Sequence, residues 1–294
     1  MTAKLLSLRL TMLFALFSVC SRSTPETGLP IVAVSIQPQK YFVEKIARNL
    51  VSVLVMVPPG VSEHTYEPKP FQMASLSRAA LYFGIGIEFE HAWLPRLAGT
   101  YPQLKVVHTD SGIAKMPMEE PLFIGTTEDT HEHEGLDPHL WLSPEFVKVQ
   151  ATTMTAALCD RFPRHAAEFR ANDLLFMVEI DSLQQEIKTE LARRSGTDPI
   201  MVFHPAWGYF AREFGLRQMA IEVQGKEPSA RDLGTIIDYA QKNRVSTIFV
   251  QPQFSRRTAE IIAREVGARI VIADPLAADW AGNLRNFAKA LVQP

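Results

Sequence analysis

Three histidines and one aspartate lie where an α/β protein is expected to bind ligands. The 294-residue chain has eight histidines, and two of them, His64 and His204, follow apolar runs typical of buried β-strands. Asp274 follows a third such run, and His139 lies in a constrained Asp-Pro-His loop. Because open α/β sheets bind ligands at the carboxyl ends of their strands, these four side chains could meet in one cleft.

Three imidazoles and one carboxylate form a suitable tetrahedral shell for zinc. Neutral imidazole also suits copper, nickel and iron, whereas manganese generally prefers more oxygen ligands. The four residues are separated by 75, 65 and 70 positions, so they form no local motif. Spacing alone therefore leaves both a metal site and unrelated roles open for them.

The strands that would place these residues are predicted in two groups of four. Most of the runs are apolar at consecutive positions, which is typical of parallel strands covered by helices on both faces. The first group is 31–35, 51–57, 81–85 and 104–107, and the second is 200–203, 217–221, 247–250 and 269–273. Helices are predicted between strands at 41–48, 70–78, 230–242 and 258–266, and Ser229 and Asp232 form a capping box at the third.

A different composition separates the two groups of strands. Residues 144–194 contain no glycine, and Pro163 is expected to divide them into two helices. The second, about 164–194, is rich in residues that favour helix, and Ser195-Gly196 would end it. The prediction is an α/β protein with two lobes, each a roughly four-stranded parallel sheet covered by helices, joined by one long rigid helix. A single large sheet with an inserted helical hairpin is the alternative.

The chain is expected to divide into four parts. They are a signal peptide with a tether at 1–28, an N-terminal metal-binding lobe at 29–143, a helical region with the long linker helix at 144–196, and a C-terminal metal-binding lobe at 197–294. This division follows the predicted strands and helices, and it leaves the cleft between the lobes for the ligands.

The first residues are typical of an export signal. Lys4 and Arg9 precede an apolar core at 10–19, which is shorter than the ~20 residues of a membrane-spanning helix. A buried N-terminal helix is the alternative. Cys20 ends the core and resembles the acylated cysteine of bacterial lipoproteins, although Val19 stands where a small residue is usual. We therefore expect a protein in the periplasm or on the outer face of the cytoplasmic membrane, with Cys20 as a candidate lipidation site.

Composition excludes several other classes of protein. Thirty basic and 32 acidic residues give a net charge of −2, which provides no general attraction to nucleic acid. The two cysteines, Cys20 and Cys159, exclude a multi-cysteine zinc or iron–sulfur cluster. A hydrophobic fraction of 47% is enough for a large core and excludes disorder for most of the chain.

Six segments between residues 30 and about 287 resemble, in the same order, the metal-binding solute-binding proteins of bacterial ABC transporters for zinc and manganese, above all the zinc-uptake type. They read GVSEHTYEP at 60–68, DPHLWLSP at 137–144, FHPAWGYF at 203–210, EPSA at 227–230, FVQPQF at 249–254 and DPL at 274–276. The chain departs from the family at Pro205, where Asp is frequent, and after Leu276, where the usual Gly is missing.

This resemblance implies a function and a set of ligands. His64, His139, His204 and Asp274 would bind the ion, and His204 favours zinc because manganese proteins of the family commonly carry Glu there. The expected protein is a monomer that is not an enzyme and that delivers zinc to an ABC membrane permease. Binding of manganese or iron within the same transporter class is the alternative.

Three further residues are candidates for an auxiliary role in metal binding. Glu63 precedes the first histidine, and zinc proteins of the family can use such a glutamate as an additional ligand. His131 and His133 lie in an acidic segment at 128–134 that could capture zinc weakly. A solvated acidic loop without metal is the alternative for this segment.

Two functions of other classes remain open at this level. A zinc hydrolase with the same ligands would need an open coordination position and a general base, for which Glu63 is available, but the chain has no HExxH motif. A receptor for an organic solute could use the same two-lobed shape without metal.

Overall fold

The computed structural model describes residues 28–118, 135–194, 199–222 and 226–293. The expected signal segment with Cys20, the acidic segment with His131 and His133, and the helix stop at Ser195-Gly196 lie outside these residues. None of the described helices is both long and apolar enough to cross a bilayer.

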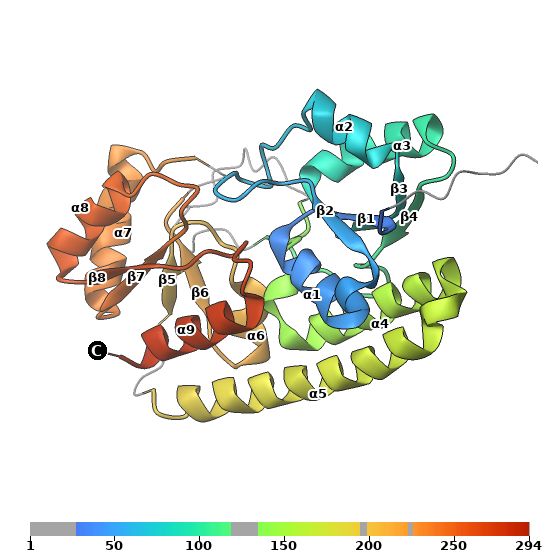
Figure 1. Cartoon of the computed structure of the whole chain (residues 1–294). Helices are drawn as coiled ribbons and strands as arrows, with labels where there is room; N and C mark the ends of the chain where they lie inside the picture. Colours follow the sequence, from blue (N-terminus) through green and yellow to red (C-terminus); the bar gives the residue numbers. More distant parts are fainter. Residues whose placement is uncertain (1–27, 119–134, 195–198, 223–225, 294) are drawn as a thin grey trace, which may run out of the picture.

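Two four-stranded parallel sheets form the two lobes (Figure 1). The first sheet has the order β2-β1-β3-β4 and the second β6-β5-β7-β8, so both lobes repeat one topology. The strands are β1 (Ile31–Val34), β2 (Ser52–Val55), β3 (Ala79–Gly84), β4 (Lys105–His108), β5 (Ile200–Val202), β6 (Gln218–Ala220), β7 (Thr247–Val250) and β8 (Arg269–Ile272). All eight predicted strands are present, and the expected two-sheet architecture is confirmed.

Helices cover the sheets, and three of them were not predicted. In the first lobe they are α1 (Gln37–Ala47), α2 (Pro70–Leu76) and α3 (Glu88–Thr100). In the second lobe they are α6 (Gly208–Glu213), α7 (Ala230–Lys242), α8 (Arg257–Val266) and α9 (Trp280–Val292). The helices that were not predicted are α3, α6 and α9. Pro95 lies inside α3, where a proline ordinarily argues against helix.

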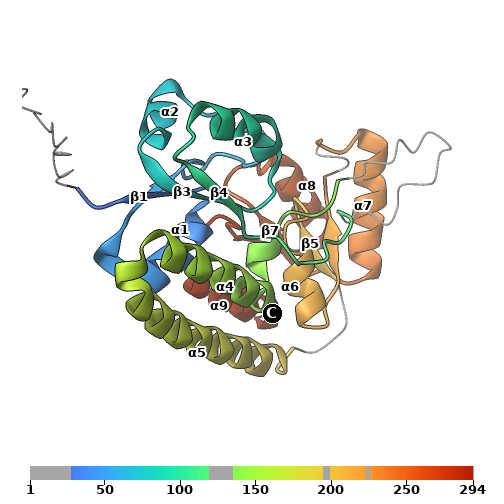
Figure 2. The ribbon, with the colours of Figure 1, turned by 90° about the vertical axis from the view of Figure 1, so that its right-hand side faces the viewer.

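A long helix runs along both lobes. Helix α4 (Pro144–Arg161) leads through a short 3-10 turn, Pro163–His165, into α5 (Ala166–Leu191), whose 26 residues span about 39 Å. Figures 1 and 2 show α5 beneath the rest of the molecule, where it packs on α1, α4 and α9. Its buried positions recur at helical spacing and are Phe169, Phe176, Ile180, Leu183 and Ile187.

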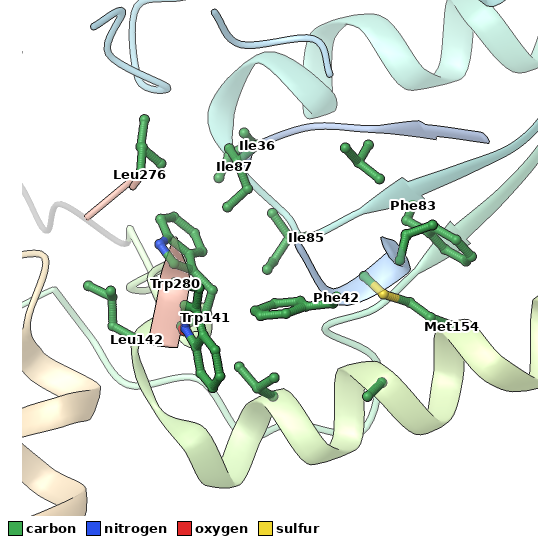
Figure 3. Close-up of a cluster of buried hydrophobic side chains, with 14 of the residues drawn as sticks. Ile36, Phe42, Phe83, Ile85, Ile87, Trp141, Leu142, Met154, Leu276 and Trp280 are labelled. Carbon is green, nitrogen blue, oxygen red and sulfur yellow. The ribbon is translucent and has the colours of Figure 1, made fainter. Parts of the chain in front are cut away.

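One hydrophobic core continues from the first lobe into the second. Trp280, at the start of α9, meets the ring of Phe42 edge-on at 5.2 Å between centroids (Figure 3). The Trp280 Nε1 atom donates to the Trp141 carbonyl at 2.6 Å, and Trp141 Nε1 donates to the Pro275 carbonyl at 2.7 Å. Because each lobe donates a buried hydrogen bond to the other, these contacts oppose a wide opening of the lobes.

Candidate metal centre

Three imidazole nitrogens converge between the lobes. The Nε2 atom of His204 lies 2.9 Å from Nε2 of His64 and 3.4 Å from Nε2 of His139. The ligand atoms of these three residues all lie within 4.8 Å of one another, so the three form a group that could hold a metal ion. Zinc–nitrogen bonds of 2.0–2.1 Å in a tetrahedron would separate the nitrogens by about 3.3 Å, so the spacing suits that ion.

Each histidine is placed by the end of a strand or by a short turn. His204 follows β5 almost directly, and His64 lies in the loop between β2 and α2. His139 immediately precedes a 3-10 turn, Leu140–Leu142, that leads into α4. His139 and His204 are buried, and His64 is partly exposed.

A carboxylate holds the other ring nitrogen of each histidine. The Nδ1 atoms of His64, His139 and His204 lie 2.8, 2.7 and 2.6 Å from an acidic oxygen. The partners, in the same order, are Glu88 at the start of α3, Asp137 in the His139 loop and Glu222 after β6. In a neutral ring, an Nδ1–H that donates to a carboxylate leaves Nε2 with a free lone pair, which is the tautomer that a metal ion requires.

The Glu63 carboxylate lies close to two of the converging Nε2 atoms. Its Oε1 atom lies 3.5 Å from Nε2 of His139 and 3.8 Å from Nε2 of His64. The side chain is buried, so little water competes for this oxygen. Glu63 is therefore placed to supply an anionic oxygen beside the nitrogens of His139 and His64.

The structure does not bring Asp274 into this group. Its Oδ1 atom accepts hydrogen bonds from Gln253 Nε2 at 2.9 Å and from the Leu276 backbone N–H at 3.0 Å. These bonds hold the carboxylate within its own loop after β8. The expectation that Asp274 completes a common cluster with the three histidines therefore differs from the arrangement seen here.

Burial and charge set the protonation of the site. Burial acts to raise the pKa of Glu63, but His139 and His64 outweigh it and lower that pKa to about 2. Burial acts to lower the pKa of His139, but Asp137 and Glu63 outweigh it and raise that pKa to about 10. Burial lowers the pKa of His204 despite the Glu222 carboxylate. Without metal, the site therefore holds an ionised Glu63, a protonated His139 and a neutral His204 at pH 7.

Sequence reasoning missed Glu88 and Glu222. Both follow the carboxyl end of a predicted strand, β3 and β6, which is the same signal that singled out His204. Neither residue lies next to a candidate ligand in the sequence, so no local pattern indicated that they contact His64 and His204. Asp137 lies within the DPH segment and was noted there without a role.

The comparisons with known proteins point to one family. The family model for the zinc-uptake complex component A, periplasmic, matches residues 32–293. A crystal structure of a ZnuA protein is 41% identical, with a TM-score of 0.83 over 90% of this chain and 98% of that chain. A ZnuA deletion mutant with zinc bound is 40% identical, with a TM-score of 0.81 over 91% and 100% of the two chains. The high-affinity zinc uptake system protein ZnuA of Bacillus subtilis is 27% identical over 83% of this chain and 78% of its own length.

Proposed function

Since the chain belongs to the family of the periplasmic zinc-uptake complex component A, we propose that it captures a zinc ion outside the cytoplasm and delivers it to the membrane permease of an ABC transporter. The convergence of the Nε2 atoms of His64, His139 and His204 carries this proposal. A solute-binding protein needs such a site between its lobes, where a permease can reach the ion.

The proposed ligands are these three nitrogens and the Glu63 carboxylate. Glu63 Oε1 lies 3.5 and 3.8 Å from two of the nitrogens, close to the about 3.3 Å between ligand atoms of a zinc tetrahedron. The Oδ1 atom of Asp274 is instead hydrogen-bonded to Gln253 and to the Leu276 N–H, and the carboxylate lies outside the group of three nitrogens. Asp274 is therefore the second candidate for the fourth position.

The donor set favours zinc over manganese. Three imidazole nitrogens and one oxygen match the tetrahedral preference of zinc, whereas manganese suits sites that are richer in oxygen. A fourth protein ligand also fills the coordination position that a catalytic zinc reserves for water. These two features support capture of zinc rather than zinc-dependent hydrolysis.

We place the mature protein on the outer side of the cytoplasmic membrane, as a monomer, after removal of the signal peptide that precedes Cys20. Acylation of Cys20 would tether it there, close to the permease. Mass spectrometry of the protein from membranes of the native host tests this part, because a diacylglyceryl group on Cys20 adds a defined mass that Cys20→Ser abolishes. An unmodified N-terminus in a soluble extract would contradict the tether.

A chelator competition titration with zinc tests the ligand set. His139→Ala and His204→Ala should each weaken zinc binding by orders of magnitude with the fold intact by circular dichroism. Glu63→Gln should weaken it by about 10- to 100-fold, and Asp274→Asn should leave it within about threefold. If Asp274→Asn has the larger effect, Asp274 rather than Glu63 is the fourth ligand, and unchanged binding in His204→Ala would refute the site.

A further inference from the structure

Two buried glutamines hold the loop that carries His204. Gln251, directly after β7, accepts a hydrogen bond from the His204 N–H at 3.2 Å and donates to the His204 carbonyl at 2.7 Å. Gln218, in β6, accepts from the Trp207 N–H at 3.0 Å and donates to the Pro205 carbonyl at 3.0 Å. Each amide thus pairs with the backbone as a neighbouring peptide group would.

These amides replace a missing strand neighbour. The loop leaves the sheet at the end of β5, so its backbone groups lose their ladder partners in a buried place. Gln251 is 1% exposed, so its amide is out of contact with bulk water. Because a glutamine amide is neutral, it satisfies both a donor and an acceptor without adding charge near the Glu222 side chain.

The ring of His204 is held from two further directions. Glu222 accepts from Nδ1 at 2.6 Å, and the ring of Phe254 stacks on the imidazole with centroids 5.3 Å apart and planes inclined by 19°. Backbone, ring edge and ring face of His204 are therefore all constrained. Its Nε2 atom is the centre of the site, since it is the atom with close contacts to both other Nε2 atoms.

On the basis of the proposed zinc site, we propose that Gln251 is a positioning residue that sets the metal selectivity of that site, because its two backbone hydrogen bonds fix the place of the His204 Nε2 atom. A rigid set of nitrogens suits the short bonds of zinc. Cadmium accepts the same nitrogen ligands but is larger, so it gains when the loop can move outward. Loosening His204 should therefore weaken zinc binding more than cadmium binding.

The first lobe contains a matched control. Gln39 in α1 is also fully buried, and its amide bonds the Ser35 N–H at 2.9 Å and the Phe83 carbonyl at 3.1 Å. Neither of these backbone groups belongs to a loop with a proposed ligand. Gln39→Met therefore removes a similar pair of buried bonds without freeing a histidine.

The experiment compares wild type, Gln251→Met and Gln39→Met by chelator competition with zinc and with cadmium, and by the visible spectrum of the cobalt(II) form. Gln251→Met should lower zinc affinity by about tenfold or more and reduce the zinc-to-cadmium affinity ratio by about tenfold. The intense absorption of tetrahedral cobalt should weaken. Gln39→Met should lower the melting temperature about as much as Gln251→Met does. It should keep the zinc-to-cadmium affinity ratio within about twofold of wild type and leave the cobalt spectrum unchanged.

An unchanged ratio and spectrum in Gln251→Met, or an equal change in Gln39→Met, would overturn the proposal. If Gln251→Met does not fold, Gln251→Asn makes the same test, since the shorter side chain keeps an amide but cannot reach both backbone groups. Wild-type protein that binds no zinc would overturn the proposed function together with this inference, whereas zinc binding with an unchanged ratio overturns the inference alone.

Discussion

Zinc binding should release a proton from His139. In the metal-free protein Asp137 and Glu63 raise the pKa of His139 to about 10, so the ring is doubly protonated at neutral pH. Its Nδ1–H donates to Asp137 at 2.7 Å and can remain, whereas the proton on Nε2 occupies the lone pair that zinc needs. The ion must displace that proton, and the Glu63 carboxylate that faces it then becomes free to bind the metal.

The sign and the size of the pH dependence follow from this competition. Below pH 10 the protonated form of His139 dominates in the metal-free protein, so each unit of decrease in pH stabilises that form by about 1.4 kcal/mol relative to the zinc complex. Zinc affinity should therefore fall about tenfold per pH unit, or about 100-fold from pH 8 to pH 6. The ordinary histidine pKa of about 6.5 would instead predict a nearly constant affinity above pH 7.

Two measurements test this prediction. Chelator competition at pH 6, 7 and 8 gives the slope of zinc affinity, and calorimetry at pH 8 in two buffers with different ionisation enthalpies gives the number of protons released. We expect about one proton or more at pH 8. Asp137→Asn should reduce this number, because it removes one of the two carboxylates that raise the pKa of His139. Constant affinity between pH 7 and 8 with no proton release would refute the reasoning.

Three further predictions concern the fold and the choice of ion. Trp280→Phe keeps the ring packing but leaves the buried Trp141 carbonyl without its donor. The free energy of unfolding in urea should therefore fall by about 1–3 kcal/mol. An unchanged free energy of unfolding would contradict the role of this bond between the lobes. Glu90→Ala removes the buried carboxylate that accepts from the Ile85 and Gly86 N–H groups. The free energy of unfolding should fall by about 3 kcal/mol in the same assay, and an unchanged midpoint of the urea transition would contradict this. His204→Glu exchanges nitrogen for oxygen and should raise manganese affinity relative to zinc in a competition titration, and an unchanged ratio would show that this position does not select the ion.

The fold could be predicted in most of its parts because its signals are local. Consecutive apolar residues identified all eight strands, and the glycine-free segment 144–194 contained α4 and α5. Helix α3 was missed because Pro95 breaks its pattern, although the structure accommodates that proline inside the helix. The contact of Trp280 with Phe42 joins residues 238 positions apart, and no sequence pattern encodes a contact of that range.

The histidines of the site could be predicted from the sequence, whereas the acidic residues around them could be predicted only in part. His64 and His204 each follow the carboxyl end of a strand, one in each sheet, and this is the edge where α/β sheets bind ligands. Asp274 obeys the same rule, but its carboxylate is engaged by Gln253, and a competing hydrogen bond of this kind cannot be read from a sequence. The roles of Glu222 and Gln251 depend on side-chain directions within a few ångströms, which only coordinates provide.

A crystal structure of the protein purified without added metal, with anomalous scattering recorded on both sides of the zinc edge, tests the central claim most directly. We predict one strong zinc peak about 2.0–2.1 Å from the Nε2 atoms of His64, His139 and His204, with an oxygen of Glu63 as the fourth ligand. A zinc peak elsewhere, or a site that stays empty after soaking with zinc, would contradict it.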